Sequence, residues 1–216
     1  MTADARLGAW PVDDGAVAFR LWAPDAAQVE LVLAGAAIPM RREPDGTHWV
    51  HTSAGHGDCY RYRLPDGSEV PDPASRWQPD GIDGPSAVVM PGHHVWLTVQ
   101  SNPVAWSDMV IYEVHVGAAG GFEALIAQLP MLAETGITAI ELMPVAQFPG
   151  NRNWGYDGVF PYAPAQAYGG PDALKGFVDA AHAAGMAVLL DVVYNHFGPQ
   201  GNHLAQYAKA FFRSGH

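Results

Sequence analysis

Three side chains with acid, amide and imidazole chemistry stand within one six-residue segment late in the chain. The segment Asp191–His196 reads DVVYNH, and its polar members are Asp191, Asn195 and His196. It follows the run Met186–Leu190, which has no polar alternation and is therefore typical of a parallel strand covered on both faces. A buried carboxylate without a partner is costly. The pattern thus predicts that Asp191 ends a buried strand and belongs to a functional site.

A second candidate site is the loop Phe148–Gly158, which reads FPGNRNWGYDG. Sugars need this mixture of side chains, because C–H faces stack on aromatic rings while hydroxyls bond to planar polar groups. The same rings could instead form a hydrophobic plug. A nucleotide site is disfavoured, since no G-x-G-x-x-G or Walker loop follows any expected strand. Trp77 and Trp96, outside the loop, are interpreted as core or interface residues rather than sugar platforms.

From residue 109 the chain alternates expected strands with expected helices. The strands are Met109–Val116, Ile137–Met143 and Met186–Leu190. One helix, with apolar residues at helical spacing, runs from Phe122 to Gly136 and is kinked at Pro130. A second helix opens at Gly170 and ends at Gly185. This alternation indicates right-handed βαβ units and a parallel sheet, either open or closed into a barrel.

Polar residues gather on one side of these strands, near their C-terminal ends. Glu113 and His115 share a face of the first strand, Glu141 lies on the second, and Asp191 ends the third. In a (β/α)8 barrel this end carries the functional site, so the distribution favours a barrel. The first three residues are interpreted as an internal polar network that positions its neighbours. Asp191 is interpreted as a site residue.

The first hundred residues follow a different pattern, in which short segments are separated by turn residues. The expected strands are Ala16–Trp22, Val29–Leu33, His48–Thr52 and Tyr60–Leu64. In the last of them Tyr60, Tyr62 and Leu64 share one face. The pattern predicts a small antiparallel sandwich over residues 1–100. Within it, residues 71–92 are too rich in proline and glycine for any regular element, and we expect an ordered linker or an edge-covering loop.

Composition limits the classes of function. The chain has 216 residues, of which 49% are hydrophobic and 15% charged, as in a compact globular protein. Its formal net charge of −11 disfavours nucleic acid as a partner, because a phosphate backbone would be repelled. Cys59 is the only cysteine, which favours a reducing compartment. With no signal-peptide pattern and no membrane-spanning run, the sequence predicts a cytoplasmic protein without a membrane partner.

Four stretches of the chain resemble the α-amylase superfamily, glycoside hydrolase family 13. They are Phe19–Pro24, Pro71–Arg76 with Gly84–Ser86, Glu141–Asp157, and Asp191–Gly201, and they span nearly the whole chain. The resemblance implies an immunoglobulin-like sandwich of the carbohydrate-binding-module-48 type over residues 1–100. It further implies that residues 101–216 form the first three βα units of a (β/α)8 TIM barrel, a fold that typically takes about 250 residues.

The resemblance also assigns a role to each candidate site residue. The implied substrate-binding residues are Tyr156, Asp157, Asp191, His196, Trp154 and Asn195. Tyr156 would stack on the sugar in the −1 subsite. Asp191 and His196 would lie under the same sugar, with His196 bonding a hydroxyl and Asp191 orienting the site from beneath. Asn195 matches a position that serves calcium in many amylases, but no metal and no cofactor is expected in this chain.

A reaction and a substrate are implied as well. Within the family, the match is closer to enzymes that hydrolyse, with retention, the α-1,4 bond next to the trehalose end of maltooligosyltrehalose. A 1,4-α-glucan branching enzyme and a non-catalytic carbohydrate-binding protein are the alternatives. A retaining glycosidase needs a nucleophile and an acid/base carboxylate about 5–5.5 Å apart, and in the family both lie on later strands. We therefore expect no catalytic residue in this chain, which would be the front part of a longer enzyme. By itself the chain is expected to bind maltooligosaccharide but not to cleave it.

Overall fold

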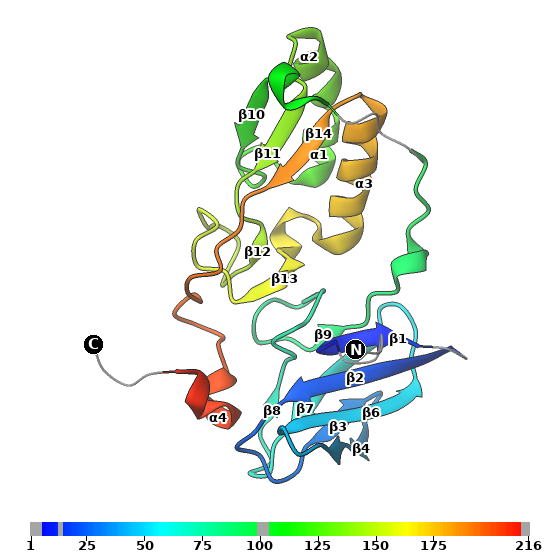
Figure 1. Cartoon of the computed structure of the whole chain (residues 1–216), viewed down its shortest axis with the longest axis vertical. Coiled ribbons are helices and arrows are strands. Elements are labelled where there is room, and N and C mark those ends of the chain that lie inside the picture. The colour runs from blue at the N-terminus through cyan, green and yellow to red at the C-terminus, as the bar shows by residue number, and fades with distance from the viewer. Residues whose placement is uncertain (1–5, 13–14, 99–103, 213–216) are drawn as a thin grey trace. The chain divides into compact units, whose positions relative to one another are not determined.

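The computed structural model describes residues 6–12, 15–98 and 104–212, and it divides the chain into two compact units. Residues up to His93 and the segment from Pro199 onward form the first unit, and His94–Gly198 form the second. Antiparallel strands make up most of the first unit, whereas the second combines parallel strands with helices (Figure 1). Among the described residues, no helix has the length and apolar character needed to cross a lipid bilayer.

The first unit contains two antiparallel sheets. Its strands are β1 Gly8–Pro11, β2 Ala16–Trp22, β3 Glu30–Leu33, β4 Ala36–Pro39, β5 Arg41–Arg42, β6 Thr47–Ser53, β7 Cys59–Arg63, β8 Glu69–Val70 and β9 Ser86–Ala87. The first sheet has the order β1-β2-β6-β5, and the second has the order β4-β3-β7-β8 with β9 also paired to β7. The predicted antiparallel β domain is confirmed. The expectation of no regular element in residues 71–92 is wrong at β9, because its backbone groups pair with β7.

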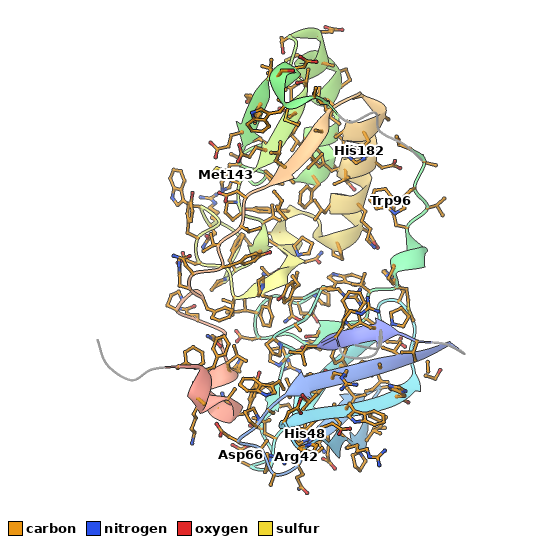
Figure 2. All side chains as sticks on the ribbon, viewed as in Figure 1. Arg42, His48, Asp66, Trp96, Met143 and His182 are labelled. Carbon is orange, nitrogen blue, oxygen red and sulfur yellow. The ribbon has the colours of Figure 1, made fainter. Side chains whose placement is uncertain are left out.

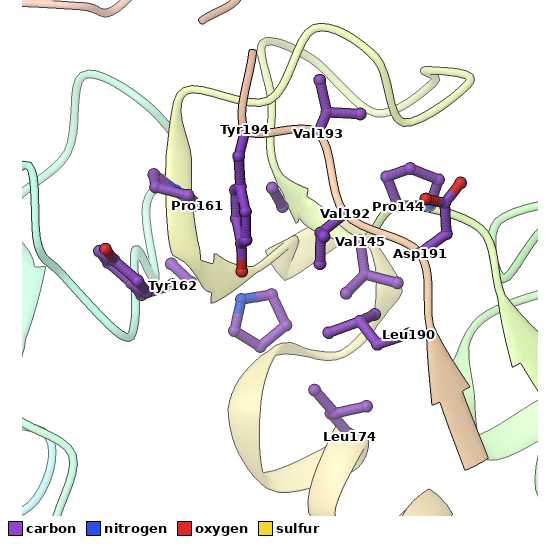
Figure 3. Close-up of a pocket in the computed structure, with 13 residues that line it drawn as sticks. Pro144, Val145, Pro161, Tyr162, Leu174, Leu190, Asp191, Val192, Val193 and Tyr194 are labelled. Atoms are coloured by element: carbon purple, nitrogen blue, oxygen red, sulfur yellow. The ribbon is translucent and has the colours of Figure 1, made fainter. Parts of the chain in front are cut away.

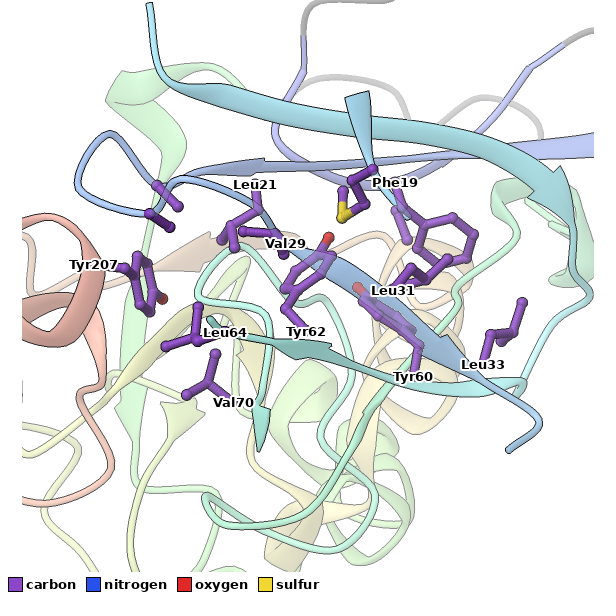
Figure 4. Close-up of a cluster of buried hydrophobic side chains, with 14 of the residues drawn as sticks. Phe19, Leu21, Val29, Leu31, Leu33, Tyr60, Tyr62, Leu64, Val70 and Tyr207 are labelled. Carbon is purple, nitrogen blue, oxygen red and sulfur yellow. The ribbon is translucent and has the colours of Figure 1, made fainter. Parts of the chain in front are cut away.

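The two sheets share one apolar core (Figure 4). Tyr60, Tyr62 and Leu64 are all buried, which confirms the predicted alternation. From the other sheet, Phe19 of β2 packs edge-on against Tyr60, with ring centroids 4.9 Å apart. Burying a large apolar side chain contributes about 1.5–3 kcal/mol, so this alternation decides which face of β7 turns inward.

A buried carboxylate ties the proline-rich segment to this core. Asp72 is fully buried, and its carboxylate accepts hydrogen bonds from the Tyr60 hydroxyl (2.7 Å) and the Ala74 N–H (2.8 Å). The Asp72 N–H donates to Ser86 Oγ (2.9 Å), and Ser86 donates to Gln78 Oε1 (2.6 Å). Burial raises the pKa of Asp72 to about 6, because the charged form loses its solvation. This segment is therefore an integral part of the first unit and not a spacer.

The segment that follows Gly198 also belongs to the first unit. It contains the helix α4 (Leu204–Tyr207) and the 3₁₀ turn η6 (Lys209–Phe211). The Tyr207 side chain is buried in the core of this unit (Figure 4), and its carbonyl accepts the Asp25 N–H at 3.0 Å. The predicted division grouped this segment with the βα part of the chain. The structure differs because the apolar partners of Tyr207 come from the two antiparallel sheets.

The second unit has the predicted alternation of strands and helices. Its elements are β10 Ile111–Val114, α1 Phe122–Ile126, α2 Leu129–Glu134, β11 Ala139–Leu142, β12 Ala146–Gln147, β13 Phe160–Pro164, α3 Gly170–Ala183 and β14 Ala187–Leu190, with 3₁₀ turns η4 Trp106–Asp108 and η5 Gln166–Tyr168. A parallel sheet has the order β10-β11-β14, and β12 and β13 form an antiparallel ribbon. The predicted kink is a break between α1 and α2. Pro130 lies in the first turn of α2, where its missing N–H would be unbonded anyway.

The helices cover one face of the parallel sheet. Ile140 and Leu142 of β11 belong to a second apolar core that includes Phe122 of α1 and Phe177 of α3. All four side chains are almost completely buried. Alternate residues of β11 point to the opposite face, so the helices set the inner face of the sheet by covering these two side chains.

The opposite face of the sheet carries acidic residues. Glu113 of β10 lies in register with Glu141 of β11, which lies in register with Leu189 of β14. Glu113 is exposed, and Glu141 and Leu189 are partly exposed. The prediction that Met186–Leu190 is covered on both faces is therefore wrong in the described structure, and Leu190 itself is 50% exposed. The physical reason is that the helices pack on one side and β14 is an edge strand.

A carboxylate on α3 anchors the segment at which the second unit begins. Asp179 accepts the N–H groups of Leu97 and Thr98, both at 2.8 Å. These hydrogen bonds lower the pKa of Asp179, and the bond from Leu97 has the largest effect. Trp96 lies on the same segment (Figure 2), contacts His94 edge-on and is 45% exposed, so it is not a core residue.

Candidate functional site

The candidate site lies at the carboxyl end of the parallel sheet. The Met143 N–H donates to the Val114 carbonyl (3.0 Å), and the Asp191 N–H donates to the Leu142 carbonyl (2.9 Å). These bonds continue the pairing one residue beyond β11 and β14. The chain therefore leaves these two strands at the same edge, as parallel strands must, and the segments that follow them start as neighbours.

Gln147 closes the base of residues 148–158, which we call the aromatic loop. Its side chain is almost completely buried. Its Oε1 accepts the Gln166 N–H (2.7 Å), and its Nε2 donates to the Phe148 carbonyl (2.8 Å). The backbone carbonyl of Gln147 accepts the Val159 N–H (2.8 Å). A buried amide with its bonds satisfied fixes the loop base, and no sequence motif marks this residue.

Asn153 organises the tip of the aromatic loop. Its Oδ1 accepts the N–H groups of Gly155 (2.7 Å) and Asp157 (3.4 Å), and its Nδ2 donates to Asp157 Oδ2 (3.0 Å). Asn side chains commonly bond to backbone two residues further on and so stabilise turns. Asn153 is absent from the predicted site residues. An asparagine two positions before a glycine is the sequence signal that could have identified it.

The two aromatic rings at the tip are exposed. Trp154 is 77% exposed and Tyr156 is 48% exposed. Between them Gly155 has a φ of +102°, and a Cβ there would lie 2.5 Å from the Pro144 carbonyl oxygen, so only glycine fits. Neither ring fills a core among the described residues, which argues against a hydrophobic plug. We call the two rings the platform.

His196 joins the segment after β14 to the platform. Its Nε2 lies 2.9 Å from the Tyr156 carbonyl oxygen, and its Nδ1 lies 3.0 Å from Asn195 Oδ1. A carbonyl only accepts hydrogen bonds, so Nε2 carries a proton and donates to it. Beside this contact the Gly198 N–H donates to the Gly158 carbonyl (2.9 Å). The structure thus brings together two segments that the sequence marked separately.

Asp191 has a different environment from the one predicted. Its side chain is partly exposed, because β14 is an edge strand that ends in an open segment. The prediction of a buried carboxylate is therefore wrong. Figure 3 shows the carboxylate beside Pro144, pointing away from Leu174 and Leu190. Leu174 and Leu190 line a small cavity of about 80 Å³. Its full lining is Pro144, Val145, Ala146, Pro161, Tyr162, Ala163, Pro164, Leu174, Leu190, Asp191, Val192, Val193 and Tyr194.

A larger hollow of about 490 Å³ adjoins the platform. It is lined by His115, Gly117, Ala118, Asn151, Arg152, Asn153, Trp154 and Tyr168. Its volume lies within the range of about 300–1,000 Å³ that is usual for small-molecule sites. Its lining combines an exposed indole with amide and guanidinium groups, which suits a ligand with both apolar faces and hydroxyls.

Two family models match the chain. The model for the alpha amylase catalytic domain matches residues 72–211. The chain belongs to the α-amylase family. The model for carbohydrate-binding module 48, described as the isoamylase N-terminal domain, matches residues 6–78. This α-amylase family chain therefore carries an N-terminal module-48 domain followed by part of an α-amylase catalytic domain.

Three relatives of this α-amylase family chain show which proteins it is similar to. Malto-oligosyltrehalose trehalohydrolases from Saccharolobus solfataricus and Deinococcus radiodurans are each 44% identical to it, and the alignments cover 94% and 96% of this chain but 37% and 35% of the relatives. A crystal structure of a candidate alpha amylase from Salmonella typhimurium has a TM-score of 0.93 and 48% identity, covering 96% of this chain and 36% of that one. This family member spans about a third of the length of these relatives.

Proposed function

We propose that this chain forms part of the sugar-binding side of a glycoside hydrolase acting on α-glucans. The whole protein then releases trehalose by hydrolysing the α-1,4 bond next to the trehalose end of maltooligosyltrehalose. One observation carries the proposal. Two exposed rings, Trp154 and Tyr156, stand on a loop whose tip is fastened to His196. The names of the trehalohydrolase relatives support the choice of substrate.

The platform supplies the apolar half of sugar recognition. Pyranose rings present C–H faces that pack on aromatic rings, and the apolar surface buried in such a contact contributes about 25 cal/mol per Å². Tyr156 stacks on the sugar of the −1 subsite, and Trp154 extends the surface beside it. The rings need no rearrangement to do so, because Asn153 and Gly155 already hold the turn between them. Such preorganisation favours affinity.

The polar half comes from side chains around the platform. Asp157, Asp191 and Asn195 are exposed or partly exposed and can accept or donate hydrogen bonds to hydroxyls. Both ring nitrogens of His196 already face protein groups. His196 therefore acts first by holding the Tyr156 backbone, and a sugar hydroxyl reaches its ring by replacing the exposed Asn195 amide.

The same proposal covers the finer points of the fold. The first unit is an immunoglobulin-like sandwich, supported by two antiparallel sheets around a common core. The strands β10, β11 and β14 are the first three strands of a (β/α)8 barrel, supported by their parallel order and by acidic residues on one face. In such barrels functional sites lie at the carboxyl end of the strands, which is where the platform is found.

No nucleophile and no acid/base residue is assigned to this chain. Hydrolysis with retention needs two carboxyl groups about 5–5.5 Å apart on either side of the scissile bond. Glu113, Glu141 and Asp191 are treated as structural or binding residues. The proposed contribution of this chain is therefore recognition, and bond cleavage is assigned to the whole protein.

A second candidate function is carbohydrate binding without catalysis. It is favoured by the match of residues 6–78 to carbohydrate-binding module 48. In that case the first unit binds glucan and the platform has no effect on affinity. A branching enzyme is the less favoured alternative, because the relatives from Saccharolobus solfataricus and Deinococcus radiodurans are named as trehalohydrolases.

Removal of the Tyr156 ring tests the proposal. Titration calorimetry of the 216-residue protein with maltotetraose is expected to show binding, and Tyr156→Ala is expected to weaken it about tenfold. The reason is that roughly 55 Å² of apolar ring surface covered by a sugar, at about 25 cal/mol per Å², is worth about 1.4 kcal/mol. The substitution leaves the backbone carbonyl that bonds His196 in place. The measured change therefore reports the ring itself.

Tyr112→Ala is the matched control for this experiment. Tyr112 lies on β10 and is 42% exposed, close to the 48% of Tyr156. Its loss is expected to leave maltotetraose affinity unchanged. Equal affinities of the wild type and Tyr156→Ala would favour binding by the first unit instead, and a wild type that does not bind would overturn the proposal.

A further inference from the structure

We propose that His115 is a positioning residue that fixes the geometry of the platform from the end of β10. The inference rests on the proposed function only in treating the platform as a sugar-binding surface. His115 lies one residue beyond β10 (Ile111–Val114), and its ring reaches the aromatic loop. The platform rings, Trp154 and Tyr156, lie within three residues of Asn153. The His115 ring contacts the backbone carbonyl of Asn153 directly.

Hydrogen bonds at both ring nitrogens define the tautomer of His115. Its Nδ1 accepts the Ala118 N–H (2.9 Å). An amide N–H can only donate, so the proton of the neutral ring lies on Nε2. Nε2 therefore donates to the Asn153 carbonyl at 2.6 Å. The ring thus connects the turn after β10 with the aromatic loop, and it does so in one orientation.

Asn153 passes this constraint to the platform. Its carbonyl is held by His115, while its side chain holds the N–H groups of Gly155 and Asp157. Trp154 and Tyr156 alternate with these held residues along the chain. A shift of the Asn153 backbone therefore moves both rings. The His115 ring holds that backbone and also meets the Trp154 ring edge-on, with centroids 6.5 Å apart.

Close packing keeps the His115 ring in place. The Tyr168 ring contacts it edge-on at 5.9 Å and packs in turn against Phe148 at 5.4 Å. Gly117 has no room for a Cβ, which would lie 2.7 Å from Tyr168 Cε1 and 3.0 Å from His115 Cε1. The Tyr168 hydroxyl also donates to the Asn153 carbonyl, at the longer distance of 3.3 Å. His115 therefore makes the shorter of the two side-chain bonds to this carbonyl.

Two substitutions of His115 test its two hydrogen bonds one at a time. His115→Asn places an amide oxygen near the position of Nδ1 and keeps an acceptor for Ala118, but it is too short to reach Asn153. His115→Gln reaches further and places an N–H donor near the position of Nε2. If positioning depends on the bond to Asn153, the glutamine variant rescues it and the asparagine variant does not.

Amide hydrogen exchange measured by NMR on the 216-residue chain tests positioning without any ligand. Exchange of the Gly155 and Asp157 amides is expected to be about tenfold faster in His115→Asn, since a lost hydrogen bond is worth about 1–1.5 kcal/mol, and near the wild-type rate in His115→Gln. The amide of Phe177, in the core helix α3, is expected to be unchanged. Tyr168→Phe, which removes only the longer bond, is expected to have a smaller effect.

Binding of maltotetraose provides the second readout. His115→Asn is expected to weaken it about tenfold and His115→Gln to restore most of the affinity. Unchanged exchange at Gly155 and Asp157 in His115→Asn overturns the inference, as does equal acceleration at these amides and at Phe177. If the wild type does not bind maltotetraose, the proposed function fails, and the exchange rates alone then decide whether His115 positions the loop.

Discussion

Gly198→Ala is expected to abolish most sugar binding while both units stay folded. A Cβ at this position would overlap the Asp157 carbonyl oxygen, a backbone atom that cannot rotate away. The segment after β14 would then move off the aromatic loop, breaking the Gly198 bond to Gly158 and the His196 bond to Tyr156. Two lost hydrogen bonds, at about 1–1.5 kcal/mol each, weaken binding about a hundredfold. Calorimetric titration with maltotetraose measures the effect.

Gly176→Ala is the control for this prediction. Gly176 lies inside α3, where an added Cβ meets no atom within 4 Å. Alanine in a helix interior is more stable than glycine by about 0.5–1 kcal/mol, so the control is expected to raise the unfolding temperature slightly and to leave binding unchanged. If Gly198→Ala binds as tightly as this control, the junction between the two segments does not position the platform.

Acidification is expected to stabilise the first unit through Asp72. The pKa of this carboxyl is about 6 in the folded protein, because of burial, compared with its usual 3.8. Between these two values the folded state binds more protons than the unfolded state, so the contribution of Asp72 grows as the pH falls through 6 and is complete below about 3.8. It is lost again as the pH rises through 6. The difference corresponds to about 3 kcal/mol of unfolding free energy.

Asp72→Asn isolates this contribution, because it has nearly the same shape and does not ionise. Urea unfolding of both proteins at pH 7 and pH 4 is expected to show that the wild type gains stability relative to the variant on acidification. Burial lowers the pKa of His48, and that residue works in the opposite direction, losing its contribution as the pH falls below about 6.5. His48 is present in both proteins, so it cancels in the comparison. Identical pH dependence would mean that the Asp72 charge is not penalised by burial.

Local patterns in the sequence were sufficient to predict most elements. The alternation of Tyr60, Tyr62 and Leu64 predicted the inner face of β7, because a two-residue period allows only one buried face. Pro130 predicted the break between α1 and α2, and Gly170 predicted the start of α3. These features depend on a few neighbouring residues, and the chemistry of proline and glycine determines them.

Features that depend on distant residues could not be predicted in this way. Nothing near Tyr207 indicates that its partners are in the first unit, where Lys209 bonds an aspartate 184 positions earlier in the chain. Likewise, the apolar run before Asp191 gave the wrong burial, because periodicity does not reveal how many faces of a sheet are covered. The His115 contact with Asn153 joins residues 38 positions apart, and neither residue type marks it.

The return of the chain to the first unit after Gly198 has a consequence for the order of folding. A ribosome delivers residues from the N-terminus, and domains generally fold as they emerge. The core of the first unit includes Tyr207, whereas His94–Gly198 form the inserted second unit. Residues 94–198 are therefore synthesised before the first unit can complete its core. The entropy of closing so long an insertion grows only slowly with its length, so the first unit can still bring Tyr207 into its core after these residues have emerged.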